Sequence, residues 1–154
     1  MKNGDLALEG ANLSIVSGTA KLVQDLRCAI LEARGHDPFH PEFGSIIDGG
    51  VDTNGIYSPS MIGEMDWAFV ALRVKSEINR ICEAQQRVQI DRDRNDRSRY
   101  GSSTLDRSEV LKSVTSINIS QTQDKMMVSV KILTAANTTA IISLPVAQRA
   151  QEVI

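Results

Sequence analysis

The chain has 154 residues, a length that suits one domain, and 42% of them are hydrophobic, which is enough to bury a core. A formal net charge of -2 argues against nucleic acid or an anionic membrane surface as a partner, and no stretch approaches the roughly 18 apolar residues that cross a bilayer. Cys28 and Cys82 show neither a CxxC nor a Cys/His spacing, so they indicate no zinc site and are expected to be buried free thiols.

The first part of the chain predicts a hairpin followed by a helix. Apolar residues alternate with others on both sides of a turn at residues 10–12, as is typical of a two-stranded ribbon. Ser17 then suits a helix N-cap, and helical spacing of apolar residues predicts an amphipathic helix over residues 18–34 that ends at Gly35. The stripe that this helix should bury comprises Leu22, Val23, Leu26, Ala29, Ile30 and Ala33.

The middle of the chain predicts a long loop and a second helix. Three prolines and four glycines within residues 36–59 indicate a loop without regular structure. A second helix should begin at Pro59, capped by Ser58 or Ser60, run to about residue 88 and pack against the first helix. Its apolar stripe comprises Ile62, Met65, Phe69, Leu72, Ile78 and Ile81, with Trp67 and Val74 beside it.

Beyond this helix lies a charged segment and then a series of strands. In residues 91–104 acids and bases alternate, which is typical of a solvated, mobile excursion, with a docking surface as the alternative. Residues 113–120 and 126–134 alternate around a turn at 121–124, and residues 138–144 supply a third strand. Pro145 should stop that strand before a tail, residues 145–154, that could be helical. We therefore expect a single α+β domain over residues 1–154: two packed helices against a small, mostly antiparallel sheet, with an N-terminal hairpin.

The segment GHDPFHPEFGS, residues 35–45 (the elbow), holds the densest group of ionisable side chains: His36, Asp37, His40 and Glu42. A metal site needs converging ligands, whereas Pro38 and Pro41 push the residues before them towards extended conformation. We therefore expect no metal and no cofactor. As architecture, the elbow is a rigid exit from the helix, in which Phe39 and Phe43 anchor it to the core and Gly44 permits a sharp turn.

Enzymatic readings find little support in the motifs. A glycan hydrolase needs two carboxylates on a rigid frame with one of them desolvated, and none of Glu32, Asp37 and Glu42 lies in an apolar context. The sequence has no Gly-x-Ser-x-Gly elbow and no glycine-rich phosphate loop after a strand. We therefore expect a protein that is not an enzyme.

The order of these motifs resembles the baseplate wedge family of contractile-tailed phages, which is sometimes labelled lysozyme-like. The resemblance covers roughly residues 3–145 and is carried by "NGDLAL", by "VSGTAKLVQDLRCAILEARGHDPFHPEFGS", by a long helix and by "SVTSINISQTQDKMMVSVKIL". Members typically show a helix with a glutamine, a loop containing glycine, two prolines and an aromatic–glycine pair, a second helix and a terminal sheet. The matching residues are Gln24, Gly35, Pro41, Phe43 and Gly44.

The resemblance implies structural work in a virion. Such proteins lie near the tail tube in multiple copies of a symmetric baseplate assembled in the host cytoplasm, contact the helical bundle of other wedge subunits, and start the contractile sheath by accepting strands at a sheet edge. Its implied partners are wedge, tail tube and sheath proteins, with no nucleic acid and no membrane. Many members carry a Glu-Pro-Arg motif that contacts the bundle; here the stretch is Gln85-Gln86-Arg87, which keeps only the arginine. The partner-binding residues implied are Gly35, Pro41, Phe43, Gly44, Gln85 and Arg87.

Three classes of function therefore stay open. The leading hypothesis is the baseplate component, and its rival is a tail-associated peptidoglycan-degrading enzyme that uses a pair of carboxylates including Glu42 or Glu32. A nucleic-acid-binding module using the arginines between residues 87 and 107 is disfavoured by the nearly balanced local charge.

Overall fold

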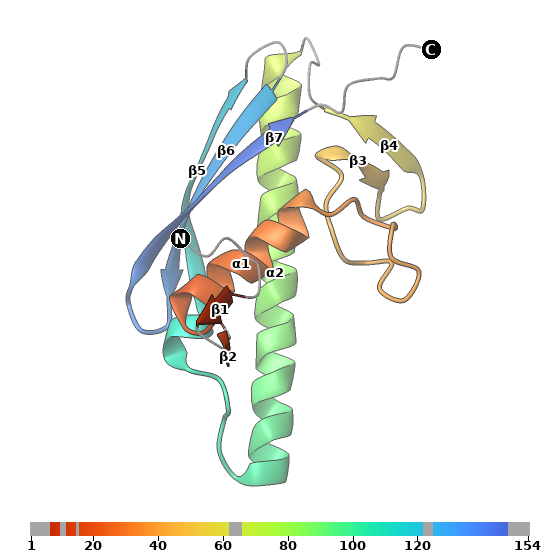
Figure 1. The fold of residues 1–154 in the computed structure, drawn as a ribbon. Helices are drawn as coiled ribbons and strands as arrows, with labels where there is room; N and C mark the ends of the chain where they lie inside the picture. The colour runs from red at the N-terminus through yellow and green to blue at the C-terminus, as the bar shows by residue number, and fades with distance from the viewer. Residues whose placement is uncertain (1–6, 10–11, 15, 62–65, 122–124, 148–154) are drawn as a thin grey trace.

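A computed structural model describes residues 7–9, 12–14, 16–61, 66–121 and 125–147. Two α-helices lie beside a three-stranded antiparallel sheet, and two small hairpins flank them (Figure 1). This arrangement confirms the predicted α+β class. The elements in chain order are β1 (Ala7–Glu9), β2 (Asn12–Ser14), α1 (Thr19–Leu31), β3 (Asp48–Val51), β4 (Tyr57–Ser60), α2 (Trp67–Tyr100), the short 3-10 helix η1 (Arg107–Glu109), β5 (Leu111–Gln121), β6 (Lys125–Thr134) and β7 (Thr139–Ala147).

The core lies between the two helices and one face of the sheet, whose strand order is β5-β6-β7. Every second residue of β6 is buried, as a half-buried strand requires. The helices contact each other as predicted, α1 approaches β7, and α2 approaches β5. The largest fully buried side chains are Leu22, Leu26, Ile47, Val70, Val74, Ile78, Met126, Val128, Val130, Ile132, Ile142 and Leu144.

Helix α1 is shorter than predicted at both ends. Its N-cap is Gly18 rather than Ser17, and no side chain caps it. It ends at Leu31 because Glu32 is already extended, and the Ser45 hydroxyl donates to the Ile30 carbonyl oxygen at 2.5 Å. Gly35 is therefore not the helix C-cap, and Ala33 lies outside the helix. A tertiary contact, which local sequence does not reveal, terminates this helix.

Residues 36–59 are not the irregular loop that the sequence predicted, because they contain most of an antiparallel hairpin, β3–β4. Asp52 builds its turn: Asp52 Oδ1 accepts from the Asn54 N–H at 2.8 Å and from the Ile56 N–H at 3.0 Å. Pro59 lies within β4 and so does not open the second helix. The sequence Asp-Thr-Asn-Gly at residues 52–55 is typical of a hairpin turn, but the prolines and glycines around it favoured the prediction of an irregular loop.

Helix α2 begins later and ends later than predicted. Asp66 caps its start by accepting the Phe69 N–H at 3.2 Å, and the helix continues for 34 residues, about 50 Å, to Tyr100. Its buried stripe includes Val70, Val74, Ile78 and Ile81, whereas Phe69 and Leu72 are exposed, so part of the predicted stripe was wrong. The predicted Ile62 and Met65 lie outside the described residues.

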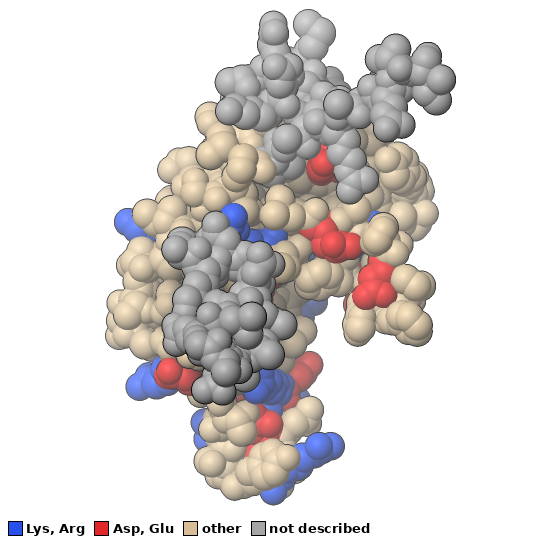
Figure 2. Space-filling view, viewed as in Figure 1, with Lys and Arg blue, Asp and Glu red and all other residues tan. Residues whose placement is uncertain are grey.

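The charged residues 91–100 are helical, which corrects the expectation of an excursion there. Pairs of opposite charge four residues apart support this end of α2: Arg92 with Asp96 at 3.8 Å and Arg97 with Asp93 at 2.9 Å. Figure 1 shows this end extending beyond the sheet, and Figure 2 shows acidic and basic side chains interspersed over it rather than a track of one sign.

The predicted strands are confirmed in type and order. Strand β7, however, runs through Pro145 to Ala147, so the proline does not stop it. The predicted tail from residue 148 and the turn residues 122–124 lie outside the described residues. Cys82 is buried, as expected, whereas Cys28 is exposed. No described helix is both long and apolar enough to span a membrane.

Candidate partner-binding site

The elbow is a closed loop whose two ends are tied together at the end of α1. Ala33 and Ser45 form a parallel bridge, in which the Ser45 N–H donates to the Glu32 carbonyl at 2.8 Å and the Arg34 N–H donates to the Ser45 carbonyl at 3.0 Å. The Ser45 side chain is buried and bonds back to α1. The elbow therefore leaves and returns at one fixed point of the core.

Gly44 makes the return possible. Its φ is +106°, and a Cβ at this position would lie 2.6 Å from the carbonyl oxygen of Glu32. Any side chain would push the two ends of the elbow apart. The predicted sharp turn at Gly44 is confirmed.

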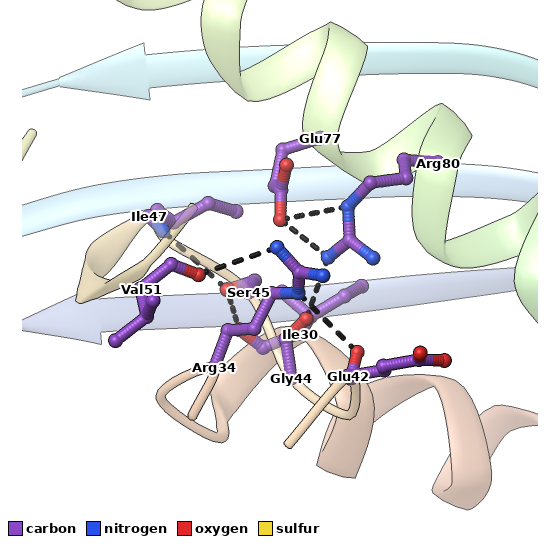
Figure 3. Close-up of polar contacts among 9 residues, drawn as sticks. All are labelled: Ile30, Arg34, Glu42, Gly44, Ser45, Ile47, Val51, Glu77 and Arg80. Atoms are coloured by element: carbon purple, nitrogen blue, oxygen red, sulfur yellow. Dashed lines mark hydrogen bonds and ion pairs between the residues drawn. The ribbon is translucent and has the colours of Figure 1, made fainter. Parts of the chain in front are cut away.

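Two arginines hold the elbow against the rest of the fold (Figure 3). Arg80 on α2 donates through Nη2 to the Gly44 carbonyl at 2.7 Å, and the same guanidinium pairs with Glu77 Oε1 at 2.5 Å. Arg34 donates to the carbonyl oxygens of Glu42 at 3.4 Å and Val51 at 3.3 Å. These contacts link the elbow to α2 and to β3. Polar contacts to backbone carbonyls thus hold the elbow in place.

The two phenylalanines do not anchor the elbow to the core, which corrects the prediction. Phe39 is 86% exposed and Phe43 is 44% exposed. The backbone contacts of Arg80 and Arg34 take over the anchoring role and leave the aromatic rings on the surface. Exposed aromatic rings that lie close together on a surface are typical of a binding site rather than of a packing contact.

Between the elbow and α2 lies a groove of about 480 Å³, which we call the elbow groove. Its lining is mostly apolar, with Ile81 at its buried side and Val88, 62% exposed, at its rim. Four of the six predicted partner-binding residues line it, although they come from two segments about 40 positions apart. Those four are Pro41, Phe43, Gly44 and Gln85.

The other two predicted partner-binding residues lie elsewhere. Gly35 lines a second, more polar hollow of about 760 Å³ between the end of α1 and the β3–β4 hairpin. Arg87 is exposed on α2 and does not line the elbow groove. The prediction missed Phe39, Ala84 and Val88 as lining residues. Ala84 and Val88 are four positions apart, so a correctly phased helix stripe would have indicated that they share a face.

Gln86 lies in the stretch aligned with the Glu-Pro-Arg motif, but its side chain makes a hydrogen bond within this chain. Its Nε2 donates to the Lys112 carbonyl at 2.9 Å. One turn along, Gln89 accepts the Leu111 N–H at 2.9 Å and donates to the Glu109 carbonyl at 2.7 Å. These two glutamines, the glutamine clamp, attach α2 to the start of β5.

The two histidines of the elbow each lie beside a different carboxylate at the surface. His36 lies 3.1 Å from Glu32, and His40 lies 3.0 Å from Asp37. The hydrogen bond from His40, together with the Phe39 N–H, lowers the pKa of Asp37 below its ordinary value. Within the described part of the chain, no three His, Cys, Asp or Glu side chains gather where they could hold a metal ion.

Comparisons with family models, with curated proteins and with solved structures found no match. The fold and the site together define an α+β domain with a mostly apolar groove between the elbow and α2. The resemblance to baseplate proteins therefore rests on the sequence motifs alone.

Proposed function

We propose that this chain is a structural component of the baseplate of a phage or phage-like contractile tail. In this role it occupies the virion in multiple copies, binds the helical bundle of the wedge subunits near the tail tube, and starts the sheath by strand addition. The observation that carries the proposal is the elbow groove, because Pro41, Phe43 and Gly44, which match the family's loop, line it together with residues of α2.

The groove suits an apolar helix of a partner. Helix-in-groove recognition requires an apolar trough with a rigid rim, and here one wall is the regular helix α2 and the other is the clamped elbow. Burying a side chain the size of Phe39 stabilises a complex by about 1.5–3 kcal/mol. Little ordering of the elbow is needed on binding, which favours affinity.

A groove-filling variant tests the bundle contact. Ala84→Arg places a long charged side chain in the groove, and Ser76→Arg makes the same change on an exposed part of α2 outside the groove. We expect Ala84→Arg to reduce incorporation into tails by at least about tenfold, a difference of about 1.4 kcal/mol, and Ser76→Arg to incorporate normally. Immunoblots of purified tails measure this, with circular dichroism to verify folding. If a folded Ala84→Arg protein incorporates normally, the elbow groove is not the contact with the wedge bundle.

The rival class is a tail-associated peptidoglycan-degrading enzyme. A general acid of this kind needs a dry environment, whereas Glu42 is exposed and Glu32 pairs with His36 at the surface. The enzyme hypothesis therefore gains no support from these carboxylates. Zymography on cell-wall substrate tests it, and clearing that Glu42→Gln abolishes would replace the structural role by a catalytic one.

A further inference from the structure

The hydrogen-bond alternation in the three-stranded sheet determines which backbone groups face outward. The Thr134 N–H donates to the Thr138 carbonyl at 2.9 Å, so even-numbered residues of β6 bond to β7. The backbone N–H and C=O groups of odd-numbered residues of β6 therefore point towards β5. In agreement, the Ala135 N–H, just after β6, donates to the Val110 carbonyl on that side at 2.9 Å. The residues of β5 that are paired with even-numbered residues of β6 must point their N–H and C=O groups away from the sheet.

Ile117 and Ile119 are the residues in this position. They are paired with Val130 and Val128, respectively, in a part of β5 where the register is regular. In the described part of the chain, neither backbone has a hydrogen-bond partner on its outer side. Outward N–H and C=O groups at strand spacing are matched by the backbone of another extended chain.

The core-facing side chains are also more exposed to solvent along β5 than along β7, the two edge strands of the sheet. On β7, the core-facing Ile142 and Leu144 are 1% and 0% exposed. On β5, the core-facing Ile117 and Ile119 are only half-buried, although they pack against the same core. A strand added beside β5 would cover these two side chains and satisfy their backbones at the same time.

Other features limit where a strand can add. On β7, Pro145 is paired with Met127, an odd-numbered residue of β6, so its nitrogen faces outward and offers no donor. At the start of β5, the glutamine clamp occupies the backbone of Leu111 and Lys112, and register shifts interrupt the ladder before Ser116. The open stretch is therefore residues 116–120.

We propose that the accepting edge is β5 at residues 116–120, and that its occupant is an extended segment of a partner subunit with apolar and polar side chains in alternation. The apolar side chains would lie beside Ile117 and Ile119, and the polar ones beside the exposed Ser116, Asn118 and Ser120. The segment needs about five residues to match this stretch. This inference rests on the proposed strand addition and specifies its place and its occupant.

Hydrogen exchange of the isolated protein and of purified tails tests the inference. We expect the amides of peptides covering residues 116–120 to become at least about tenfold slower to exchange in tails, and peptides covering residues 139–145 to change little. Protection at residues 139–145, alone or together with residues 116–120, would overturn the choice of β5 while leaving strand addition in place. Protection at neither edge would overturn strand addition itself.

Two proline variants, one on each edge strand, give an independent result. Ile117→Pro removes an outward N–H of β5 without removing a ladder bond, and Ile141→Pro does the same on β7, since Ile141 is paired with Lys131. If both proteins fold by circular dichroism, we expect tails with Ile117→Pro to lack an assembled sheath and tails with Ile141→Pro to carry one. The reverse pattern would overturn the choice of edge. If light scattering instead shows a dimer of the isolated protein that Ile117→Pro dissociates, the occupant is a second copy rather than a partner subunit, and the proposal fails.

Discussion

Replacing Arg80 with methionine should destabilise the protein through two partners at once. The guanidinium bonds the Gly44 carbonyl at 2.7 Å and Glu77 Oε1 at 2.5 Å. Glu77 is only 8% exposed, while the Arg80 side chain is 27% exposed. Methionine keeps much of the length of the side chain and removes the charge, so a carboxylate would be left nearly buried without its partner.

The magnitude follows from these burials. Breaking a buried pair by removing one partner costs about 3–5 kcal/mol, and the partial exposure of Arg80 argues for the lower end. We therefore expect a loss of about 3 kcal/mol in the free energy of unfolding, which corresponds to a fall of about 6–12 °C in Tm for a chain of this size. The elbow would also lose its link to α2.

Urea denaturation measures the loss, and two further variants make the result specific. Arg97→Met removes an exposed pair on the same helix and should lower the free energy of unfolding far less than Arg80→Met does. Glu77→Leu combined with Arg80→Met removes both charges and should recover about 1–3 kcal/mol relative to Arg80→Met alone. Equal losses for Arg80→Met and Arg97→Met, or no recovery in the double variant, would refute the reasoning.

Three further predictions concern the interior. Ser45→Ala removes the 2.5 Å bond from its buried hydroxyl to the end of α1 and should lower the free energy of unfolding by about 1–3 kcal/mol in urea denaturation. Gly50→Ala would place a Cβ 2.9 Å from the backbone nitrogen of Arg34. We expect this variant to lower the free energy of unfolding by more than about 2 kcal/mol in the same assay. Burial raises the pKa of the Cys82 thiol from 9.0 to about 11, so the unfolded chain releases this proton first and stability should fall between those pH values. Cys82→Ala should remove that part of the pH dependence in melts recorded from pH 8 to 11.

Local pattern was sufficient where an element is stabilised by its own periodicity. The alternation in residues 113–120 and 126–134 identified β5 and β6, and the stripe through Leu22 and Leu26 identified the buried face of α1. For α2, the same procedure selected Phe69 and Leu72, which are exposed, because several apolar stripes overlap in that sequence. Composition was misleading for residues 91–100, where pairs of opposite charge support a helix without any apolar face.

For the candidate site, the sequence by itself determined the residue types and the turn at Gly44, and a resemblance in the order of its motifs drew attention to Pro41, Phe43 and Gln85. Only the tertiary structure decided that these residues share one groove and that the phenylalanines lie outside the core. The same is true of the end of α1, which depends on the bond from Ser45, and of the open edge at Ile117. The physical reason is that periodicity reports the contacts of a residue with its neighbours along one element. Three other properties depend on which segment, many positions away in the sequence, packs beside a residue: its burial, the direction of its backbone hydrogen bonds in a sheet, and whether its strand lies at an edge.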